Sequence, residues 1–408
     1  MMEYGCIGEH LAHSFSKEIH NGIASYNYEI HEVAKEDLDA FMTKREFKAI
    51  NVTIPYKEAV IPYLYMIDDA AKEIGAVNTI VNKDGKLYGY NTDFMGMSAL
   101  AERIGIDFAG KKVLVLGTGG TSKTAVSVAR SKGAREVVTV SRRIGVTYED
   151  ARKYHKDAQI IINTTPCGMY PDNESMPIDL EDYPNTEAVL DAVYNPLVTK
   201  LVADAIKRGI KAECGLYMLV GQAVFASEKF MGTEYERKLI DKIFGEIFLS
   251  KQNLVLTGMP GSGKSTVGRL LAEMTGRKFV DTDRLITEKH GDIATIFETR
   301  GEQEFRNLET EAVKEAAKQC GCVIATGGGA VLRNENVDAL KSNGRIFFID
   351  RPLEELIPTE DRPLSRDTDA IRKRYEERYG IYTKTADAVI KVEGSADTVA
   401  KSILEEME

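Results

Sequence analysis

One stretch near the middle of the chain constrains the fold more than any other. It runs Leu254-Val-Leu-Thr-Gly-Met-Pro-Gly-Ser-Gly-Lys-Ser-Thr266 and joins a short apolar segment to an amphipathic one, 267–274. An apolar strand that breaks into Gly-x-x-x-x-Gly-Lys-Ser and continues as a helix has the order of a phosphate-binding loop. Its glycines let backbone N–H groups turn inward, and the helix N-terminus adds positive potential. The sequence therefore predicts that a nucleoside triphosphate binds here.

Within this loop, the residue types have separate expected tasks. Lys264 is expected to reach the terminal phosphates, and the hydroxyl of Ser265 is expected to ligate Mg²⁺. The other loop residues expected to bind ATP are Gly258, Pro260, Gly261, Ser262, Gly263 and Thr266.

Composition narrows the class of protein. A chain of 408 residues is long enough for two or three domains with substantial cores. Its formal net charge of −10 argues against a nucleic-acid or membrane-surface partner, because both favour basic patches. No apolar run approaches the ~20 residues of a membrane span, and the first residues lack a basic region followed by an apolar one. We therefore expect a cytoplasmic protein with small-molecule partners, and we leave a homodimer open.

The first part of the chain contains several clusters of polar residues, and its short apolar runs alternate with helical patterns. Strands are expected at 4–8, 50–54, 79–82 and 87–90 with helices between them, which indicates an α/β unit. Hydroxyl, amide and lysine side chains gather in His13-Ser14-Phe15-Ser16, Asn51-Val-Thr53-Ile-Pro55-Tyr-Lys57, Gly75-Ala-Val-Asn78-Thr79 and Asn91-Thr92-Asp93. Any one cluster alone also suits a capped turn or a solvated surface.

Taken together, these clusters resemble shikimate dehydrogenase, whose substrate domain carries the same motifs in the same order. The resemblance implies that the ring hydroxyls and carboxylate of the substrate are bound by Ser14, Ser16, Thr53, Asn78 and Asp93. It also implies that Lys57 and Asp93 flank the reacting carbon. Hydride delivery to a ketone creates an alkoxide, which such a Lys⁺/Asp⁻ pair can hydrogen-bond and protonate. Which of the two transfers the proton stays open, and the family's usual Asn-Pro before the hydroxyl loop is Glu9-His10 here.

A second glycine-rich turn lies within 111–130. It again has the order strand, glycine turn and helix, but without a Lys-Ser pair, which suits a pyrophosphate. The next strand, 136–140, ends in Ser141-Arg142-Arg143 where an NAD site would carry Asp or Glu, and guanidinium groups suit the 2′-phosphate of NADP. NADP(H) is therefore expected, with solvated loop arginines as the alternative. The residues expected to bind it are Gly117, Thr118, Gly119, Gly120, Thr121, Ser141, Arg142 and Arg143.

The dehydrogenase resemblance continues beyond this turn. The run 191–196 and the apolar run after Cys214 both match the family. The match implies that Tyr194 and Gln222 contact the substrate and that Gly215 lies beside the nicotinamide.

The last part of the chain carries four apolar runs beyond the phosphate-binding loop. They are 278–283, 323–329, 345–350 and 388–392, and with the strand before the loop they predict a parallel five-stranded sheet. This part resembles shikimate kinase. The motifs that carry the resemblance are Asp281-Thr-Asp283, Phe305-Arg306-Asn-Leu-Glu309, Gly327-Gly-Gly329, Arg362-Pro-Leu and Arg378-x-x-x-Tyr382.

The kinase resemblance implies a site for a small polyhydroxy acid. Arg306 and Arg378 would clamp its carboxylate, and Asp283 would accept hydrogen bonds from its hydroxyls and orient the nucleophile. The backbone at Gly327, Gly328 and Gly329 would approach the ring.

The resemblance also assigns residues to the phosphoryl transfer. Asp281 would order water around the Mg²⁺ that Ser265 holds, and Arg362 would contact ATP and close over the transferring group with Lys264. Pro358 stands about where the family commonly carries an adenine-stacking arginine, which predicts an altered nucleotide affinity or base preference.

The patterns predict an α/β protein with three domains. They are a substrate domain at 1–93, a Rossmann NADP domain at 94–220 and a P-loop kinase domain at 252–408. Helices within 221–248 are expected to pack back on the first domain.

The expected function is bifunctional. NADPH would reduce 3-dehydroshikimate to shikimate, and ATP with Mg²⁺ would phosphorylate the 3-hydroxyl of shikimate. One alternative keeps both enzymes but uses quinate or NAD in the first reaction. A second retains one half as a non-catalytic binding module, and a third, a gluconate-type P-loop kinase, leaves the attached dehydrogenase unexplained.

Overall fold

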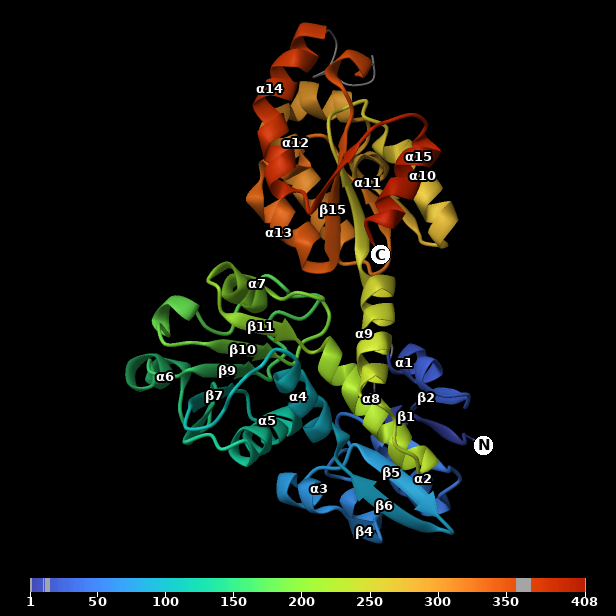
Figure 1. The fold of residues 1–408 in the computed structure, drawn as a ribbon, viewed down its shortest axis with the longest axis vertical. Helices are drawn as coiled ribbons and strands as arrows, with labels where there is room; N and C mark the ends of the chain where they lie inside the picture. Colours follow the sequence, from blue (N-terminus) through green and yellow to red (C-terminus); the bar gives the residue numbers. More distant parts are fainter. Residues whose placement is uncertain (1, 10, 12–14, 357–367, 408) are drawn as a thin grey trace. The chain divides into compact units, whose positions relative to one another are not determined.

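The computed structural model describes residues 2–9, 11, 15–356 and 368–407, and it comprises two compact units (Figure 1). The first unit is Met1–Phe248 and the second is Leu249–Glu408, so that the boundary falls within helix α9 (Lys238–Lys251). Among the described residues, no helix has the length and apolar character needed to cross a bilayer.

The first unit begins with a mixed six-stranded sheet. Its strands, in spatial order, are β2 (Tyr28–Glu32), β1 (Tyr4–Gly8), β3 (Ala49–Val52), β5 (Thr79–Lys83), β6 (Lys86–Tyr90) and β4 (Met66–Ile67). Strand β1 runs parallel to β2 and β3, whereas β5 is antiparallel to both β3 and β6. The sequence predicted the four central strands but neither edge strand, because β2 is rich in charged residues and β4 has only two residues.

Helices pack on both faces of this sheet. They are α1 (Ser16–Ile23), α2 (Leu38–Lys44), α3 (Asp69–Ile74) and α4 (Thr92–Arg103), with 3₁₀ turns η1 (Lys35–Asp37) and η2 (Ile61–Tyr63). One face packs Ile50 and Ile80 against Leu38 and Met42 of α2. The opposite face is covered by the later helix α8 (Leu216–Met231), through residues such as Phe230.

A parallel five-stranded sheet forms the rest of the first unit. Its spatial order is β11 (Lys211–Cys214), β10 (Ala188–Asp191), β9 (Ile160–Asn163), β7 (Lys112–Leu116) and β8 (Glu136–Val140). The surrounding helices are α5 (Gly120–Ser131), α6 (Tyr148–Tyr154) and α7 (Lys200–Lys207), with η3 (Leu180–Asp182). Strands β7, β9 and β10 are entirely buried, as continuous apolar runs in a sheet covered on both faces must be.

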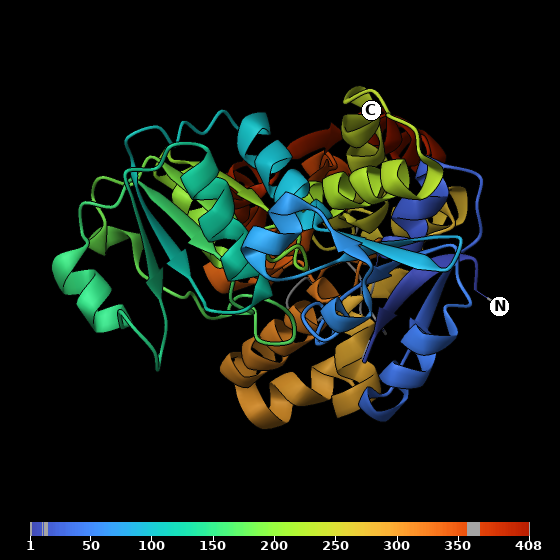
Figure 2. The same cartoon turned by 90° about the horizontal axis from the view of Figure 1, so that it is seen from below.

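Helices α4 and α8 pack against each other between the two sheets (Figures 1 and 2). Helix α8 also contacts α1, β3 and β5, whereas α4 contacts α5 of the second sheet. A chain segment that comes after the second sheet therefore supports the first one. Helix α8 belongs to the core beside β7, β9 and β10, and its residues Ala226 and Phe230 also pack on the first sheet.

The second unit has the parallel five-stranded sheet that the sequence predicted. Its order is β13 (Phe279–Asp281), β14 (Val323–Ala325), β12 (Asn253–Thr257), β15 (Gly344–Asp350) and β16 (Ala388–Lys391). One face packs against α10 (Lys264–Thr275) and α15 (Ala396–Glu405). The other face packs against α12 (Ile293–Ala317), α13 (Asn334–Asn343) and α14 (Thr368–Thr385). Helix α11 (Thr282–His290) and the turns η4 (Ala330–Leu332) and η5 (Leu353–Glu355) complete the unit.

Candidate active sites

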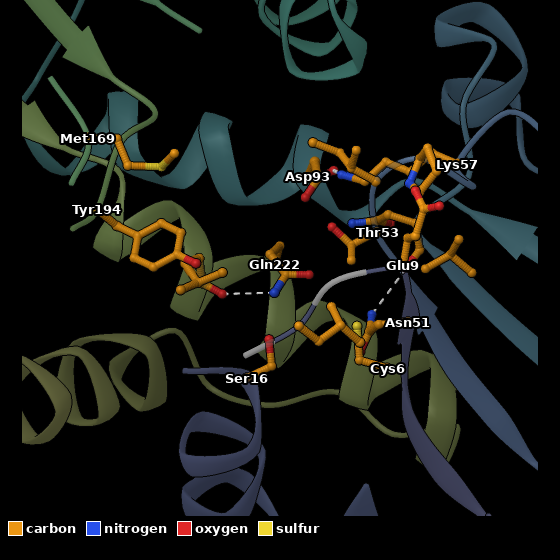
Figure 3. Close-up of a pocket in the computed structure, with 16 residues that line it drawn as sticks. Cys6, Glu9, Ser16, Asn51, Thr53, Lys57, Asp93, Met169, Tyr194 and Gln222 are labelled. Carbon is orange, nitrogen blue, oxygen red and sulfur yellow. Dashed lines mark hydrogen bonds and ion pairs between the residues drawn. The ribbon is translucent and has the colours of Figure 1, made fainter. Parts of the chain in front are cut away.

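The first unit contains a cavity of about 580 Å³ at the ends of β1 and β3 (Figure 3). It brings together seven of the eight residues predicted to bind the first substrate, namely Ser16, Thr53, Lys57, Asn78, Asp93, Tyr194 and Gln222. Ser14 lies outside the described residues. Cys6, Glu9 and Asn51 line the same cavity, although the sequence analysis assigned them no role there.

A lysine and a carboxylate form an ion pair in this cavity. The Nζ atom of Lys57 lies 2.6 Å from Oδ2 of Asp93, and the two side chains are only 18% and 12% exposed. Asp93 lies in the first turn of α4, where Asn91 caps the helix by accepting a hydrogen bond from the backbone N–H of Phe94. The cap fixes the backbone at the start of α4, and the bond from Lys57 holds the Asp93 carboxylate.

Buried amides hold the floor of the cavity. The Oδ1 atom of Asn78 accepts hydrogen bonds from the backbone N–H of Thr92 at 2.7 Å and from the hydroxyl of Thr79 at 3.0 Å. Asn51 donates to the backbone carbonyl of Asn78 and accepts from the hydroxyl of Tyr28 at 2.7 Å. These bonds connect β2, β3 and β5 to the start of α4, so the substrate floor is rigid before any ligand arrives.

The opposite wall carries a tyrosine, and Figure 3 shows Tyr194 and Met169 facing Lys57 and Thr53 across the cavity. Tyr194 packs edge-on against Phe15, with ring centroids 5.3 Å apart, and burial raises its pKa. The amide of Gln222 donates to the backbone carbonyl of Leu219 at 3.0 Å, which leaves its Oε1 atom toward the cavity as an acceptor. Burial raises the pKa of Cys6 to about 12, so this thiol stays protonated.

A second cavity of about 880 Å³ follows the glycine turn of the parallel sheet. Of the residues predicted to bind NADP, it is lined by Gly117, Thr118, Gly119, Gly120, Thr121, Ser141 and Arg142. Gly117 has a φ of +114°, and a Cβ atom there would lie 2.7 Å from Oγ1 of Thr164. Arg143 and Gly215 do not line this cavity; Gly215 caps the start of α8.

The loop after β8 is held by its own serine. The Oγ atom of Ser141 accepts from the backbone N–H of Ile144 at 2.8 Å and donates to the carbonyl of the same residue. The backbone N–H of Ser141 also donates to Val146, which closes the loop. This turn places the guanidinium-bearing residue Arg142 at the cavity, so the donor set fits a dinucleotide with a 2′-phosphate.

The two cavities of the first unit meet. Ile54 and Met169 line both of them, and their side chains are 73% and 44% exposed. The cavity that follows the glycine turn therefore adjoins the cavity that holds the Lys57–Asp93 pair. Sequence patterns do not indicate either residue, since an exposed apolar side chain in a loop has no distinctive pattern.

The second unit has its cavity, about 240 Å³, at the phosphate-binding loop. Of the predicted residues, the loop contributes Gly261, Gly263, Lys264, Ser265 and Thr266, and Asp281, Asp283 and Gly328 complete the lining. Gly258 and Gly263 have φ values of +147° and +95°, which glycine adopts readily. Lys264 is buried, and its Nζ atom donates to the carbonyls of Gly258 and Met259, both at 2.9 Å.

A hydroxyl and two carboxylates face the phosphate-binding loop. The Oγ atom of Ser265 donates to Oδ2 of Asp281 at 2.7 Å. The other oxygen of Asp281 accepts from the backbone N–H groups of Asp283 and Arg284, which caps α11. These oxygen donors fit Mg²⁺, a hard cation that is usually held by one or two side chains, waters and phosphates. The described residues contain no group of three His, Cys, Asp or Glu side chains suited to a metal ion.

Two buried arginines lie beside the Gly-Gly-Gly turn. The Nη1 atom of Arg306 donates to Oε2 of Glu309 at 2.7 Å, and Glu309 is only 1% exposed. Burial raises the pKa of Glu309, while Arg306 opposes this shift. Arg378 donates to the backbone carbonyl of Gly328 at 3.1 Å, and the hydroxyl of Tyr382 donates to the same carbonyl.

Glu309 had no predicted role. Its contact with Arg306 could have been predicted from their spacing, because residues three apart on one helix lie on the same face. Two further predicted residues lie close to residues of this cavity: Pro260 lies beside Gly328, and Gly327 lies beside Asp283. The predicted residues Ser262 and Gly329 also belong to the part of the chain that the structure describes. Arg362 and Pro358 lie outside the described residues.

Comparisons with known proteins match both units of the chain. The family model for the shikimate dehydrogenase substrate binding domain matches residues 6–80, and the shikimate kinase model matches residues 260–408. A shikimate dehydrogenase (NADP⁺) from Clostridium perfringens is 38% identical over 268 residues, which cover 60% of this chain and 98% of that protein.

Two similar solved structures are also shikimate dehydrogenases. The crystal structure of shikimate dehydrogenase 1 from Peptoclostridium difficile has a TM-score of 0.56 at 35% identity and covers 60% of this chain and 98% of its own. Shikimate 5-dehydrogenase from Thermus thermophilus, in complex with NADP(H) and shikimate, has a TM-score of 0.54 at 29% identity, with 60% and 99% coverage. The chain belongs to the shikimate dehydrogenase family and carries a shikimate kinase domain after its dehydrogenase part.

Proposed function

We propose that this chain catalyses two consecutive reactions, the NADPH-dependent reduction of 3-dehydroshikimate to shikimate and the ATP-dependent phosphorylation of the shikimate 3-hydroxyl. The observation that supports the first reaction is that the dinucleotide cavity opens on the Lys57–Asp93 pair through Ile54 and Met169. The kinase domain, with its own phosphate-binding loop, supports the second.

In the first reaction, the dinucleotide supplies a hydride when it is bound. The ketone oxygen then gains negative charge, and the ammonium group of Lys57 is placed to hydrogen-bond it. Because Asp93 accepts from Lys57, it holds the ammonium in position and stabilises its charge. Ser16, Thr53, Asn78 and Gln222 offer hydroxyl and amide groups to the ring substituents, and we propose Ser14 for the same role.

In the second reaction, phosphate oxygens replace the loop carbonyls as partners of Lys264. Ser265 and, through water, Asp281 would hold Mg²⁺, which neutralises charge on the phosphates when bound. Arg306 and Arg378, both buried, are proposed to bind the carboxylate of shikimate, and Asp283 to orient its attacking hydroxyl. Arg362 is proposed to contact the transferring phosphoryl group.

The decisive experiment separates the two reactions in one chain. NADPH oxidation is followed with 3-dehydroshikimate, and ADP release is followed with shikimate, for the Lys57→Ala and Lys264→Ala variants. Each variant should lose its own reaction and retain the other. Lys48→Ala and Lys278→Ala, which change exposed lysines in the same two units, serve as controls. A variant that keeps the full rate of its own reaction would refute the corresponding assignment.

The alternatives that use NAD or quinate are not favoured, because the relatives are named as NADP⁺ enzymes acting on shikimate. Comparing NADPH with NADH, on both 3-dehydroshikimate and 3-dehydroquinate, tests this choice. A non-catalytic half is also not favoured, because Lys57 and Asp93 line the first cavity and Lys264, Ser265 and Asp283 line the cavity at the phosphate-binding loop.

We also infer a cytoplasmic location. None of the five cysteines, all of which lie within the described residues, forms a disulfide, which fits a reducing compartment, and NADPH and ATP are both cytoplasmic metabolites. Cell fractionation with an activity assay tests the location. Sedimentation equilibrium of the purified chain decides between a monomer and the homodimer that we left open.

A further inference from the structure

Asp191 is a buried carboxylate that lines neither the substrate cavity nor the dinucleotide cavity. It ends β10 and is fully inaccessible to solvent. Its Oδ1 atom accepts from the side-chain amide of Asn163 at 2.9 Å and from the backbone N–H of Val193 at 3.0 Å. Its Oδ2 atom accepts from the hydroxyl of Thr199 at 2.7 Å. Since an isolated buried carboxylate is very unfavourable, these three donors are needed to keep it there.

One arm of this network reaches the dinucleotide cavity. Asn163 ends the neighbouring strand β9, and its Oδ1 atom accepts from the backbone N–H and the hydroxyl of Thr165, at 3.0 and 2.7 Å. Its amide also donates to the backbone carbonyl of Cys167 at 3.3 Å. Thr165 and Cys167 both line the dinucleotide cavity. Asp191 therefore fixes, through Asn163, the shape of one wall of that cavity.

The other arm reaches the substrate cavity. Val193 directly precedes Tyr194, and Thr199 caps α7 by accepting a hydrogen bond from the backbone N–H of Val202. The segment 193–199 is thus attached to Asp191 at both of its ends. Tyr194 lies on this segment and forms the wall opposite Lys57 (Figure 3).

We propose that Asp191 is a positioning residue that couples the dinucleotide site to the substrate site, because one carboxylate holds both the 163–167 segment and the Tyr194 segment. This inference rests on the proposed dehydrogenase function. When either ligand orders its own wall, the shared carboxylate orders the other wall as well, so that the second ligand binds more tightly.

The charge of this carboxylate matters for the arrangement, since all three of its partners donate to it. Burial raises the pKa of Asp191 to about 6, against the lowering effect of those hydrogen bonds. The neighbouring titratable group is the buried thiol of Cys214, whose pKa burial also raises and which therefore stays neutral. An asparagine at position 191 has nearly the same shape as the aspartate, but its side-chain NH₂ group would face one of the three donors and could not accept its hydrogen bond.

The test measures the affinity for NADP⁺ by calorimetry, with and without saturating 3-dehydroshikimate, a pair of ligands that cannot react with each other. The ratio of the two dissociation constants is the coupling factor. We expect a factor of about fivefold or more in the unmodified chain, the lower end of typical coupling. In Asp191→Asn the factor should fall towards one, although both ligands still bind. Asp179→Asn, which changes an exposed aspartate that caps η3 in the same sheet domain, should leave it unchanged.

A purely structural role would lower thermal stability without changing the coupling factor. An unchanged factor in Asp191→Asn, or a factor of one in the unmodified chain, would overturn the proposal. If Asp191→Asn does not fold, Thr199→Val, which removes one arm, and Thr199→Ser, which keeps it, decide by the same ratio. An unmodified chain that binds NADP⁺ but no ring acid would instead overturn the proposed function.

Discussion

Gly96 of α4 and Gly221 of α8 face each other so closely that a Cβ atom on Gly221 would lie 3.3 Å from the Cα atom of Gly96. Asp93 lies one helical turn before Gly96, and Gln222 follows Gly221. The close approach of these helices is therefore what brings Asp93 and Gln222, which are far apart in the sequence, into one cavity.

The first prediction concerns Gly96→Ala. The added Cβ atom would lie 2.5 Å from the backbone carbonyl oxygen of Met218, and a helix backbone cannot yield easily. We expect a loss of about 1–3 kcal/mol in unfolding free energy, as for other overpacked cores. We also expect dehydrogenase kcat/KM to fall at least tenfold while kinase activity is kept, since a small displacement of a reacting group costs large factors in rate. Calorimetry and the two activity assays measure these changes.

Gly245→Ala provides the matched control. Gly245 also lies within a helix, α9, but no atom lies within 4 Å of its added Cβ. Alanine there should be neutral or stabilise by up to about 1 kcal/mol through its helix propensity. If Gly96→Ala behaved like Gly245→Ala, the contact between α4 and α8 would not position the site.

The second prediction separates the two loop arginines. Arg142 lines the dinucleotide cavity and Arg143 does not. Arg142→Ala should raise the KM for NADPH about tenfold or more, because a hydrogen bond to a charged group is worth about 1.5–3 kcal/mol. The KM for NADH, which lacks the 2′-phosphate, should hardly change, and Arg143→Ala should have the smaller effect. Steady-state kinetics with both reductants check this; equal changes for NADPH and NADH would show that Arg142 does not read the 2′-phosphate.

Strong local patterns made the sheets of this chain predictable. In the second unit, β12, β14 and β15 carry continuous apolar runs, and the order of strands and helices along the chain was sufficient to predict its parallel sheet. Strand β11, Lys-Ala-Glu-Cys, was missed because two of its four residues are charged. It is recognisable only once β10 lies beside it, so tertiary context overrides its weak propensity.

The residues brought together at the sites were predictable only in part. Lys57, Asp93, Lys264 and Asp283 belong to short motifs that resemble known families. The hydrogen bonds that orient them were not predictable, because partners such as Tyr28 for Asn51 are 23 residues apart and follow from sheet register. Sequence patterns therefore predict which side chains belong to the sites, whereas the fold determines what holds them.

The third prediction is a pH dependence from His20. This ring is fully buried and stacks on Tyr28, with centroids 3.8 Å apart. Its Nδ1 atom forms a hydrogen bond with the hydroxyl of Tyr26. Burial lowers the pKa of His20 to about 3 from its ordinary 6.5. Between these values the unfolded chain binds more protons than the folded chain, so this group's contribution to stability is complete above pH 6.5 and is lost as the pH falls towards 3.

Calorimetry at pH 7 and pH 5 measures the effect. From pH 7 to pH 5, protonation of His20 in the unfolded chain should lower the unfolding free energy by about 2 kcal/mol, since one pKa unit corresponds to about 1.4 kcal/mol. His20→Phe keeps the stacking but cannot be protonated, so its stability should depend less steeply on pH. His31→Phe, a change of an exposed histidine, should keep the wild-type slope. Identical slopes for His20→Phe and the unmodified chain would contradict a neutral, buried His20.

The last prediction concerns the Gly-Gly-Gly turn of the kinase domain. A Cβ atom on Gly327 would lie 2.5 Å from Oδ1 of Asp283 and 2.7 Å from Oε1 of Glu309. The carboxylate proposed to orient the attacking hydroxyl and the one that holds Arg306 thus meet at a point where only a hydrogen atom fits. Gly327→Ala must push one of them away, which should lower kinase kcat/KM about 100-fold, the cost of a displacement near 1 Å. Dehydrogenase activity should be unchanged.

Gly380→Ala, in α14 with no atom within 4 Å of the added carbon, is the control and should retain full kinase activity. Because Asp283 and Arg306 have separate proposed tasks, the kinetics also show which one moves: a rise in the KM for shikimate indicates Arg306, whereas a fall in kcat alone indicates Asp283.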